Sequence, residues 1–104
     1  LIPGAALAQK TNTLVVDGSD WASATQVERR AFLVGAANMI MAENAYAKKR
    51  NAAPAPVGER MTKATEKMKL GDIEARITRW YESNPAKLGT PVMAVVWQDI
   101  VKKP

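Results

Sequence analysis

The stretch TQVERRAFLVGAANMIMAENAYA, residues 25–47, decides the fold of this chain. It opens with Thr25-Gln-Val-Glu28, a capping-box pattern in which threonine accepts a hydrogen bond from the first turn and glutamate reaches back. Ser23 with Gln26 is the competing cap. Apolar residues then follow several helical lines, which is typical of a helix at the centre of a bundle. We predict a long central helix from about Thr25 to Ala47.

Three consecutive small residues, Gly35, Ala36 and Ala37, occupy the middle of this helix. Because they lack bulk, we expect a neighbouring helix to approach closely, with Gly35 at the crossing. Asn38 follows among apolar neighbours. Its side-chain amide is expected either to hydrogen-bond to another helix or to lie at the solvent-exposed edge of the helix, the wet edge.

Prolines and glycines divide the rest of the chain. Two prolines within residues 51–56 exclude a continuous helix and predict a stiff connector. A peripheral helix is predicted over residues 58–69. Gly71-Asp72 suits a stop followed by a new cap, and a third helix is predicted over residues 73–83.

The C-terminal run begins with Thr90-Pro91, which predicts an N-cap followed by a proline at the first helical position. We predict a fourth helix over residues 92–101, although its β-branched residues would also suit a buried strand. Residues 17–20 have the composition of a turn. The sequence therefore predicts an all-α domain over residues 9–104, a single compact bundle of about four helices.

The first eight residues have a different character. Ala6 and Ala8 flank Leu7 in the A-x-A arrangement that signal peptidase requires, after an apolar stretch with a Pro-Gly break. Residues 1–8 are therefore interpreted as a signal-peptide remnant, with cleavage after Ala8 and export to the bacterial periplasm. The alternative is a disordered apolar tail.

Composition excludes several classes of chemistry. Cysteine and histidine are both absent, which removes disulfides, thiolate nucleophiles, the soft metal ligands and the commonest general base. Acidic residues occur singly, and Asp72 and Glu74 lie two apart on different sides of a helix. No catalytic residue, cofactor or metal site is predicted, and the chain is not expected to be an enzyme or to span a membrane.

The aromatic residues are the remaining candidates for a ligand site. Trp80, Tyr81 and Trp97 lie on apolar stripes, so we assign them to the core rather than to a pocket. Trp21, just before the long helix, is placed as a hydrophobic staple or lid.

A net charge of +5 favours an acidic partner. Lys48-Lys49-Arg50 complements the macrodipole at a helix C-terminus, and no aromatic residues interleave with it as a nucleic-acid site would require. Contact with an acidic protein is predicted to use the cations around the second helix and its approach. They are Lys48, Lys49, Arg50, Arg60, Lys63 and Lys67. The connector 52–57 is the next candidate.

Several short sequence motifs together carry a family resemblance. They are Trp21 with Ser23 ahead of Glu28-Arg29, Ala31-Phe-Leu-Val-Gly35, Ile77-Thr-Arg-Trp-Tyr81, Asn84-Pro85 and Pro91-Val92. In these the chain resembles small periplasmic all-helical proteins of the HdeA-like and Tai-like (Rap-type immunity) group. The resemblance implies an exported all-α domain, often with one disulfide, for which this chain lacks the cysteines.

Members of that group include acid-activated chaperones and immunity proteins that occlude toxins, and no functional residue carries over from either. The leading hypothesis is a non-enzymatic periplasmic binding or accessory protein, inhibitor-like or immunity-like. Its partner would be a periplasmic or membrane-associated protein with an acidic surface. The alternative is an acid-stress chaperone of the HdeA-like type, whose switch would depend on carboxylates because histidine is absent. An enzyme or small-ligand carrier is the third reading.

Overall fold

The computed structural model describes residues 14–103. The helices in this range are α2 (Gly18–Ser23), α3 (Gln26–Lys49), α4 (Pro56–Thr65), α5 (Leu70–Ser83) and α6 (Val92–Val95). A 3-10 turn, η1 (Pro85–Lys87), follows α5, and a π-helical segment, η2 (Val96–Val101), continues α6. Within the described range the one extended pairing is an isolated bridge between Asp17 and Pro91. The all-α prediction is confirmed. The signal-peptide prediction falls outside the described residues.

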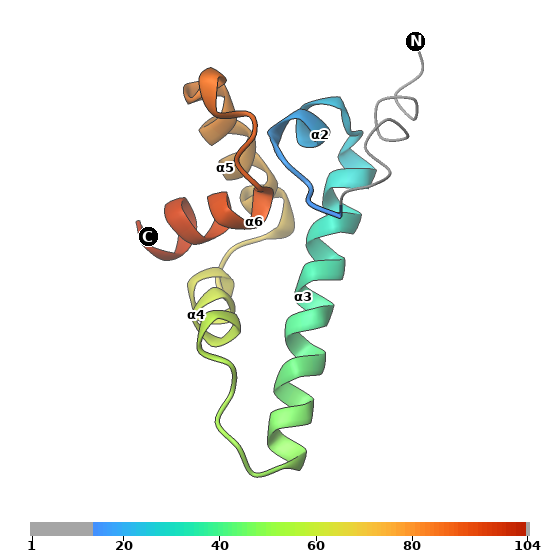
Figure 1. The fold of residues 1–104 in the computed structure, drawn as a ribbon, viewed down its shortest axis with the longest axis vertical. Coiled ribbons are helices and arrows are strands. Elements are labelled where there is room, and N and C mark those ends of the chain that lie inside the picture. Colours follow the sequence, from blue (N-terminus) through green and yellow to red (C-terminus); the bar gives the residue numbers. More distant parts are fainter. Residues whose placement is uncertain (1–13, 104) are drawn as a thin grey trace.

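The helices form two sides of an elongated molecule of 50 × 29 × 21 Å. Figure 1 shows α3 along one side, with α5, α6 and α4 following one another along the other. The connector after α3 returns the chain to α4, and α2 lies beside the beginning of α3. Every neighbour of α3 among the labelled helices therefore lies on one side of it.

The core lies between α5 and the α6–η2 segment. Its fully buried side chains are Ile77, Val92, Val95 and Ile100. Trp21 from α2 is also buried, as a core residue rather than a lid. Tyr81 is buried, and Trp80 and Trp97 are half-buried against the same cluster, as expected of core aromatics.

Local caps set the start of the first two helices. Thr25 caps α3 as predicted, and its Oγ1 accepts from Glu28 N while Glu28 Oε1 accepts from Thr25 N. Ser23 is not a cap for α3, because it ends α2 and its hydroxyl donates to Ser19 O. The predicted turn at residues 17–20 instead starts α2, with Asp17 as the cap. A short helix was missed there because turn formers are also good N-caps.

Boundaries farther along differ by a few residues. Helix α4 begins at the second connector proline, Pro56, because a proline in the first turn loses no helical hydrogen bond. The predicted helix boundary at Gly71-Asp72 is wrong, because α5 begins before it, at Leu70. Asp72 lies in the first turn of α5, where its carboxylate accepts from Lys69 N. The cap of α6 is Pro91 rather than Thr90.

The predicted close crossing at Gly35 is also wrong. A Cβ built at Gly35 meets nothing within 4 Å, so no neighbouring helix approaches this residue closely. Close approaches occur at two other glycines. A Cβ at Gly18 would overlap the Tyr81 ring, and one at Gly58 would lie 3.2 Å from Ile40 Cγ2. Small residues in a sequence do not reveal which face of a helix another helix approaches.

Candidate functional site

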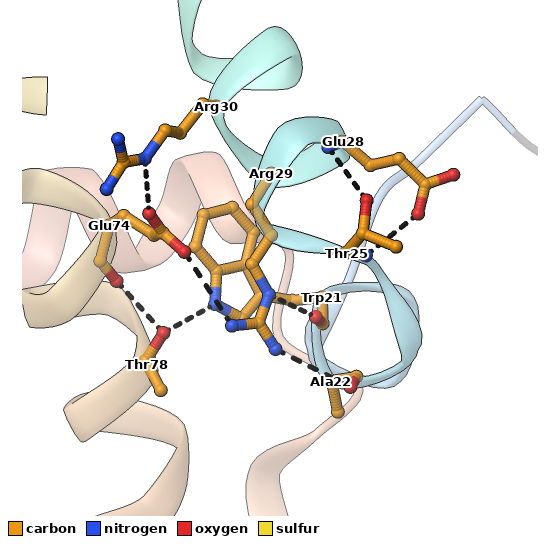
Figure 2. Close-up of polar contacts among 8 residues, drawn as sticks. All are labelled: Trp21, Ala22, Thr25, Glu28, Arg29, Arg30, Glu74 and Thr78. Carbon is orange, nitrogen blue, oxygen red and sulfur yellow. Dashed lines mark hydrogen bonds and ion pairs between the residues drawn. The ribbon is translucent and has the colours of Figure 1, made fainter. Parts of the chain in front are cut away.

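A buried carboxylate fastens α3 to α5 (Figure 2). Glu74, on α5, is 7% exposed. Its Oε1 accepts from Arg30 Nε at 2.8 Å, and its Oε2 lies 3.8 Å from Arg29 Nη1. Two consecutive arginines on α3 therefore share one acid, which offsets the cost of burying that charge.

The same cluster reaches α2. Arg29 Nε donates to Trp21 O at 2.7 Å, and its guanidinium lies 5.4 Å from the centre of the Trp21 ring. Trp21 Nε1 donates to Thr78 Oγ1 at 3.0 Å, and the Thr78 hydroxyl donates to Glu74 O at 3.0 Å. Figure 2 shows these contacts as one continuous network over three helices. The network fixes the orientation of α3 relative to α2 and α5.

This network is suited to fastening helices rather than to catalysis. Glu74 is its single carboxylate, and that group already accepts from one arginine and faces another. No group of three His, Cys, Asp or Glu side chains in residues 14–103 is placed to hold a metal ion. A second ion pair, Arg76 Nε to Asp99 Oδ2 at 2.9 Å, ties α5 to η2.

The side of α3 that faces away from this network is apolar and exposed. We call it the outward face of α3. Its exposed residues are Val27, Ala31, Val34, Asn38, Met41 and Ala45. Val27 is 77% exposed, Val34 46% and Met41 63%. Gly35, Met39, Ala42 and Tyr46 are exposed along one edge of it. From residue 31 to residue 47 the helix carries one charge, Glu43.

Geometry explains why this face is left in solvent. In the described chain α3 buries only Leu33 and Ala47. Both lie on the side that meets α4 and α5, together with half-buried Ile40. A helix turns 100° per residue, so Val27, Ala31 and Asn38 lie on the opposite side. No other described helix covers them. Val34 and Met41 lie at the edge between the two sides and line the hollow toward the other helices.

Two hollows adjoin the outward face. One, of about 510 Å³, is lined by Val15, Ala31 and Gly35 among others. The other, of about 310 Å³, lies between α3 and the helices opposite and includes Val34 and Met41. Both are mostly apolar. The apolar surface therefore extends from the helix ridge to each side.

The predicted cationic residues do not gather on a surface of one sign. Lys48 and Lys63 line the same cleft of about 630 Å³, but Glu59 and Glu66 line it too. Lys49 and Lys67 are exposed, as are the other members of the set.

The two arginines of that set are held on aromatic rings. Arg60 lies 4.8 Å from the Trp97 ring centre. Arg50 lies 5.2 Å from that of Tyr46 and donates to its hydroxyl at 2.6 Å. A cation over a ring keeps its charge but has less freedom to reach a partner. The cationic surface stays a prediction.

Sequence reasoning missed the outward face although its signal is present. The signal is a line with intervals of four and three, formed by Val27, Ala31, Val34, Asn38 and Met41. It is one of the helical lines from which the sequence predicts a central, buried helix. Asn38 marks the difference, because it is exposed and its Nδ2 donates within its own helix, to Val34 O. Of its two predicted environments, the wet edge is the one observed.

No family model, curated protein or solved structure matches this chain. Among residues 14–103, no helix combines the length and the apolar character required to cross a bilayer.

Proposed function

We propose that this chain is a non-enzymatic binding or accessory protein that contacts another protein through the outward face of α3. The observation that carries the proposal is an uncharged, apolar helix face with Val27, Val34 and Met41 substantially exposed. Contiguous exposed apolar surface is characteristic of protein-binding sites. Isolated apolar residues on a surface need no such explanation, but here they form one line.

The surroundings of this face support a binding role. The network of Arg29, Arg30 and Glu74 holds α3 against the core, so the face is presented on a rigid element. A rigid surface loses little conformational entropy when a partner binds. Periplasmic location and membership of the HdeA-like and Tai-like group remain parts of the proposal, and they would make the partner an envelope protein.

Photo-crosslinking tests the proposal. A photoreactive phenylalanine derivative is placed at Val34 or at Met41, and the variants are irradiated in the cells that naturally produce the protein. The matched control places the same group at Val57, which is 50% exposed on α4 and outside the face. We expect adducts with protein at positions 34 and 41 well above those at position 57. Equal yields at all three positions would contradict the proposal.

The cationic residues contribute a separate, testable part. Reversal of charge at Lys48, Lys49 and Arg50 should slow association with an acidic partner and flatten its dependence on salt, because exposed charges steer encounter. Stopped-flow association at low and high salt with a crosslinked partner measures this effect. Unchanged rates at low salt would exclude this end of α3 from the contact and turn attention to residues 52–57.

Acid-activated chaperone function is the second candidate, and the two ion pairs favour it. Glu74 joins α5 to α3, and Asp99 joins η2 to α5. Opening of these two junctions would uncover the inner side of α3. The protein at pH 2 to 3 should then suppress aggregation of a client at a near-stoichiometric ratio. Aggregation at the unprotected rate would remove this candidate.

A further inference from the structure

We propose that the occupant of the outward face of α3 is a second copy of the same chain, with the two α3 helices packed antiparallel. This inference rests on the proposed function, since it names the partner of the same surface. Its evidence is the spacing of the exposed residues, the size of their side chains and the charges at the two ends of the helix.

The spacing matches a helix-pairing seam. Residues 27, 31, 34, 38, 41 and 45 alternate steps of four and three, which is the a/d pattern of two-stranded helical packing. The seam spans 18 residue steps, roughly 27 Å of helix. All six residues are exposed within one copy. A line with this period can be covered along its whole length by a second straight helix.

Small residues suit close contact between two helices. Ala31 and Ala45 lie in the seam, and Gly35 and Ala42 lie along one edge of it. A Cβ at Gly35 would meet nothing within 4 Å in one copy, so the space above it is open to a neighbour. Interaxial distance depends on the side chains at the contact, and alanine and glycine permit the shortest approach.

The charges at the ends favour the antiparallel direction. Glu28 and Lys49 are three heptads apart on the same edge of the seam, near opposite ends of α3. An antiparallel pair places Glu28 of each copy near Lys49 of the other, which gives two opposite-charge contacts. An antiparallel pair also places the positive N-terminus of each helix beside the negative C-terminus of the other, whereas a parallel pair brings like ends together.

The single polar residue of the seam lies at its centre. Asn38 is adjacent to the midpoint between Glu28 and Lys49, so the two-fold axis of an antiparallel pair passes beside it. Each Asn38 then lies close to its copy, where its amide can bond across the axis. One buried asparagine in an apolar seam selects register.

The same face suits other classes of partner poorly. From residue 31 to residue 45 it has no Lys or Arg, which a nucleic acid or an anionic membrane would require. A second copy provides instead an uncharged helix of identical length and complementary ends.

Sedimentation equilibrium of the full chain tests self-association over roughly 1 μM to 1 mM, a range that covers weak to moderate Kd values. We expect a monomer–dimer equilibrium within this range. Val34→Glu and Met41→Glu should each weaken it at least tenfold, since each buries an unpaired charge in the seam. Val57→Glu, on α4, is the matched control and should leave it unchanged. Circular dichroism of each variant checks that the fold is retained.

Introduced cysteines report whether the two α3 helices pack antiparallel or parallel, because this chain has no cysteine of its own. Ala31→Cys mixed with Ala45→Cys should form a disulfide between chains under mild oxidation, since an antiparallel pair brings these positions together. Ala31→Cys alone should form little. A higher yield from Ala31→Cys alone would overturn the antiparallel arrangement.

The outcomes separate this inference from the proposed function. A protein that stays monomeric at 1 mM, but forms photo-adducts with a different protein at positions 34 and 41, overturns the second copy and retains the binding face. Absence of both dimers and adducts overturns both. A dimer that survives both glutamate substitutions also overturns the proposal, because another surface would then carry it.

Discussion

The outward face of α3 and the C-terminal segment α6–η2 are both apolar helical surfaces, but they differ completely in burial. Val92 and Val95 are 0% exposed, whereas Val27 and Val34 on α3 are 77% and 46% exposed. The C-terminal segment lies among α4, α5 and the core side chain Trp21, while α3 has helices on one side only. The apolar composition of a helix gives it a tendency to be buried, and the number of neighbouring helices decides how much of it is buried.

The largest expected effect is on the buried side of this comparison. Ile77→Ala should lower the free energy of unfolding by about 2–5 kcal/mol, because it leaves a cavity in the core. Val34→Ala should lower it by less than about 1 kcal/mol in dilute protein, since this residue is 46% exposed. Urea unfolding of both variants measures the difference. Similar losses in the two variants would show that α3 is as enclosed as the core.

The Glu74 network should have the next largest effect, because it fastens α3 to α5, the helix on which the C-terminal segment packs. Glu74→Gln leaves Arg29 and Arg30 facing a neutral amide and should cost about 1.5–3 kcal/mol. Glu66→Gln, an exposed acid on the α4 side, is the control and should cost little. Urea unfolding gives the free energies. Amide hydrogen exchange in the first turns of α3 should also rise, and unchanged exchange would contradict a fastening role.

Two glycines provide a matched pair with effects of opposite sign. Gly18→Ala forces a Cβ against the Tyr81 ring and within 2.9 Å of Leu88 O, and should destabilise by about 1–3 kcal/mol. Gly35→Ala adds a methyl group in open space within a helix, and should stabilise by up to about 1 kcal/mol. Melting temperatures give the order directly. A loss of stability in Gly35→Ala would restore the close crossing predicted from the sequence.

The last effect is absent at neutral pH and emerges only at alkaline pH. Burial raises the pKa of the Tyr81 hydroxyl from 10.0 to about 12, and the nearby carboxylates of Asp17 and Asp20 add to the rise. The folded state thus holds this proton more tightly than the unfolded state. Its contribution to stability is complete below pH 10 and is lost as the pH rises toward 12.

Absorbance titration and unfolding measure this shift. In Tyr46→Phe, Tyr81 is the chain's only tyrosine, so its ionisation is read alone and should have a midpoint near pH 12. Tyr81→Phe should show a shallower fall in urea midpoint between pH 10 and 12 than the unaltered chain. A tyrosine midpoint near pH 10 would show that the Tyr81 site is open to water.

Sequence reasoning worked where local interactions suffice. The Thr25–Glu28 capping box sets the start of α3, and the connector prolines separate α3 from α4. It failed at Gly71-Asp72, where glycine lies inside α5, because the packing of Ile77 and Glu74 stabilises the helix beyond what glycine costs. It also missed α2, whose few residues are held by the burial of Trp21.

By itself, the sequence determined the helical class, the position of the long helix and the absence of thiol and imidazole chemistry. These follow from capping, periodicity and composition, which act over a few residues. Only the tertiary structure decided which side of α3 is covered, because that depends on contacts such as Arg30 with Glu74, 44 residues apart. For the same reason it placed Gly35 in open space and left the line from Val27 to Ala45 exposed. A period of 3.6 reveals that a helix has faces, and only long-range packing selects the one that is buried.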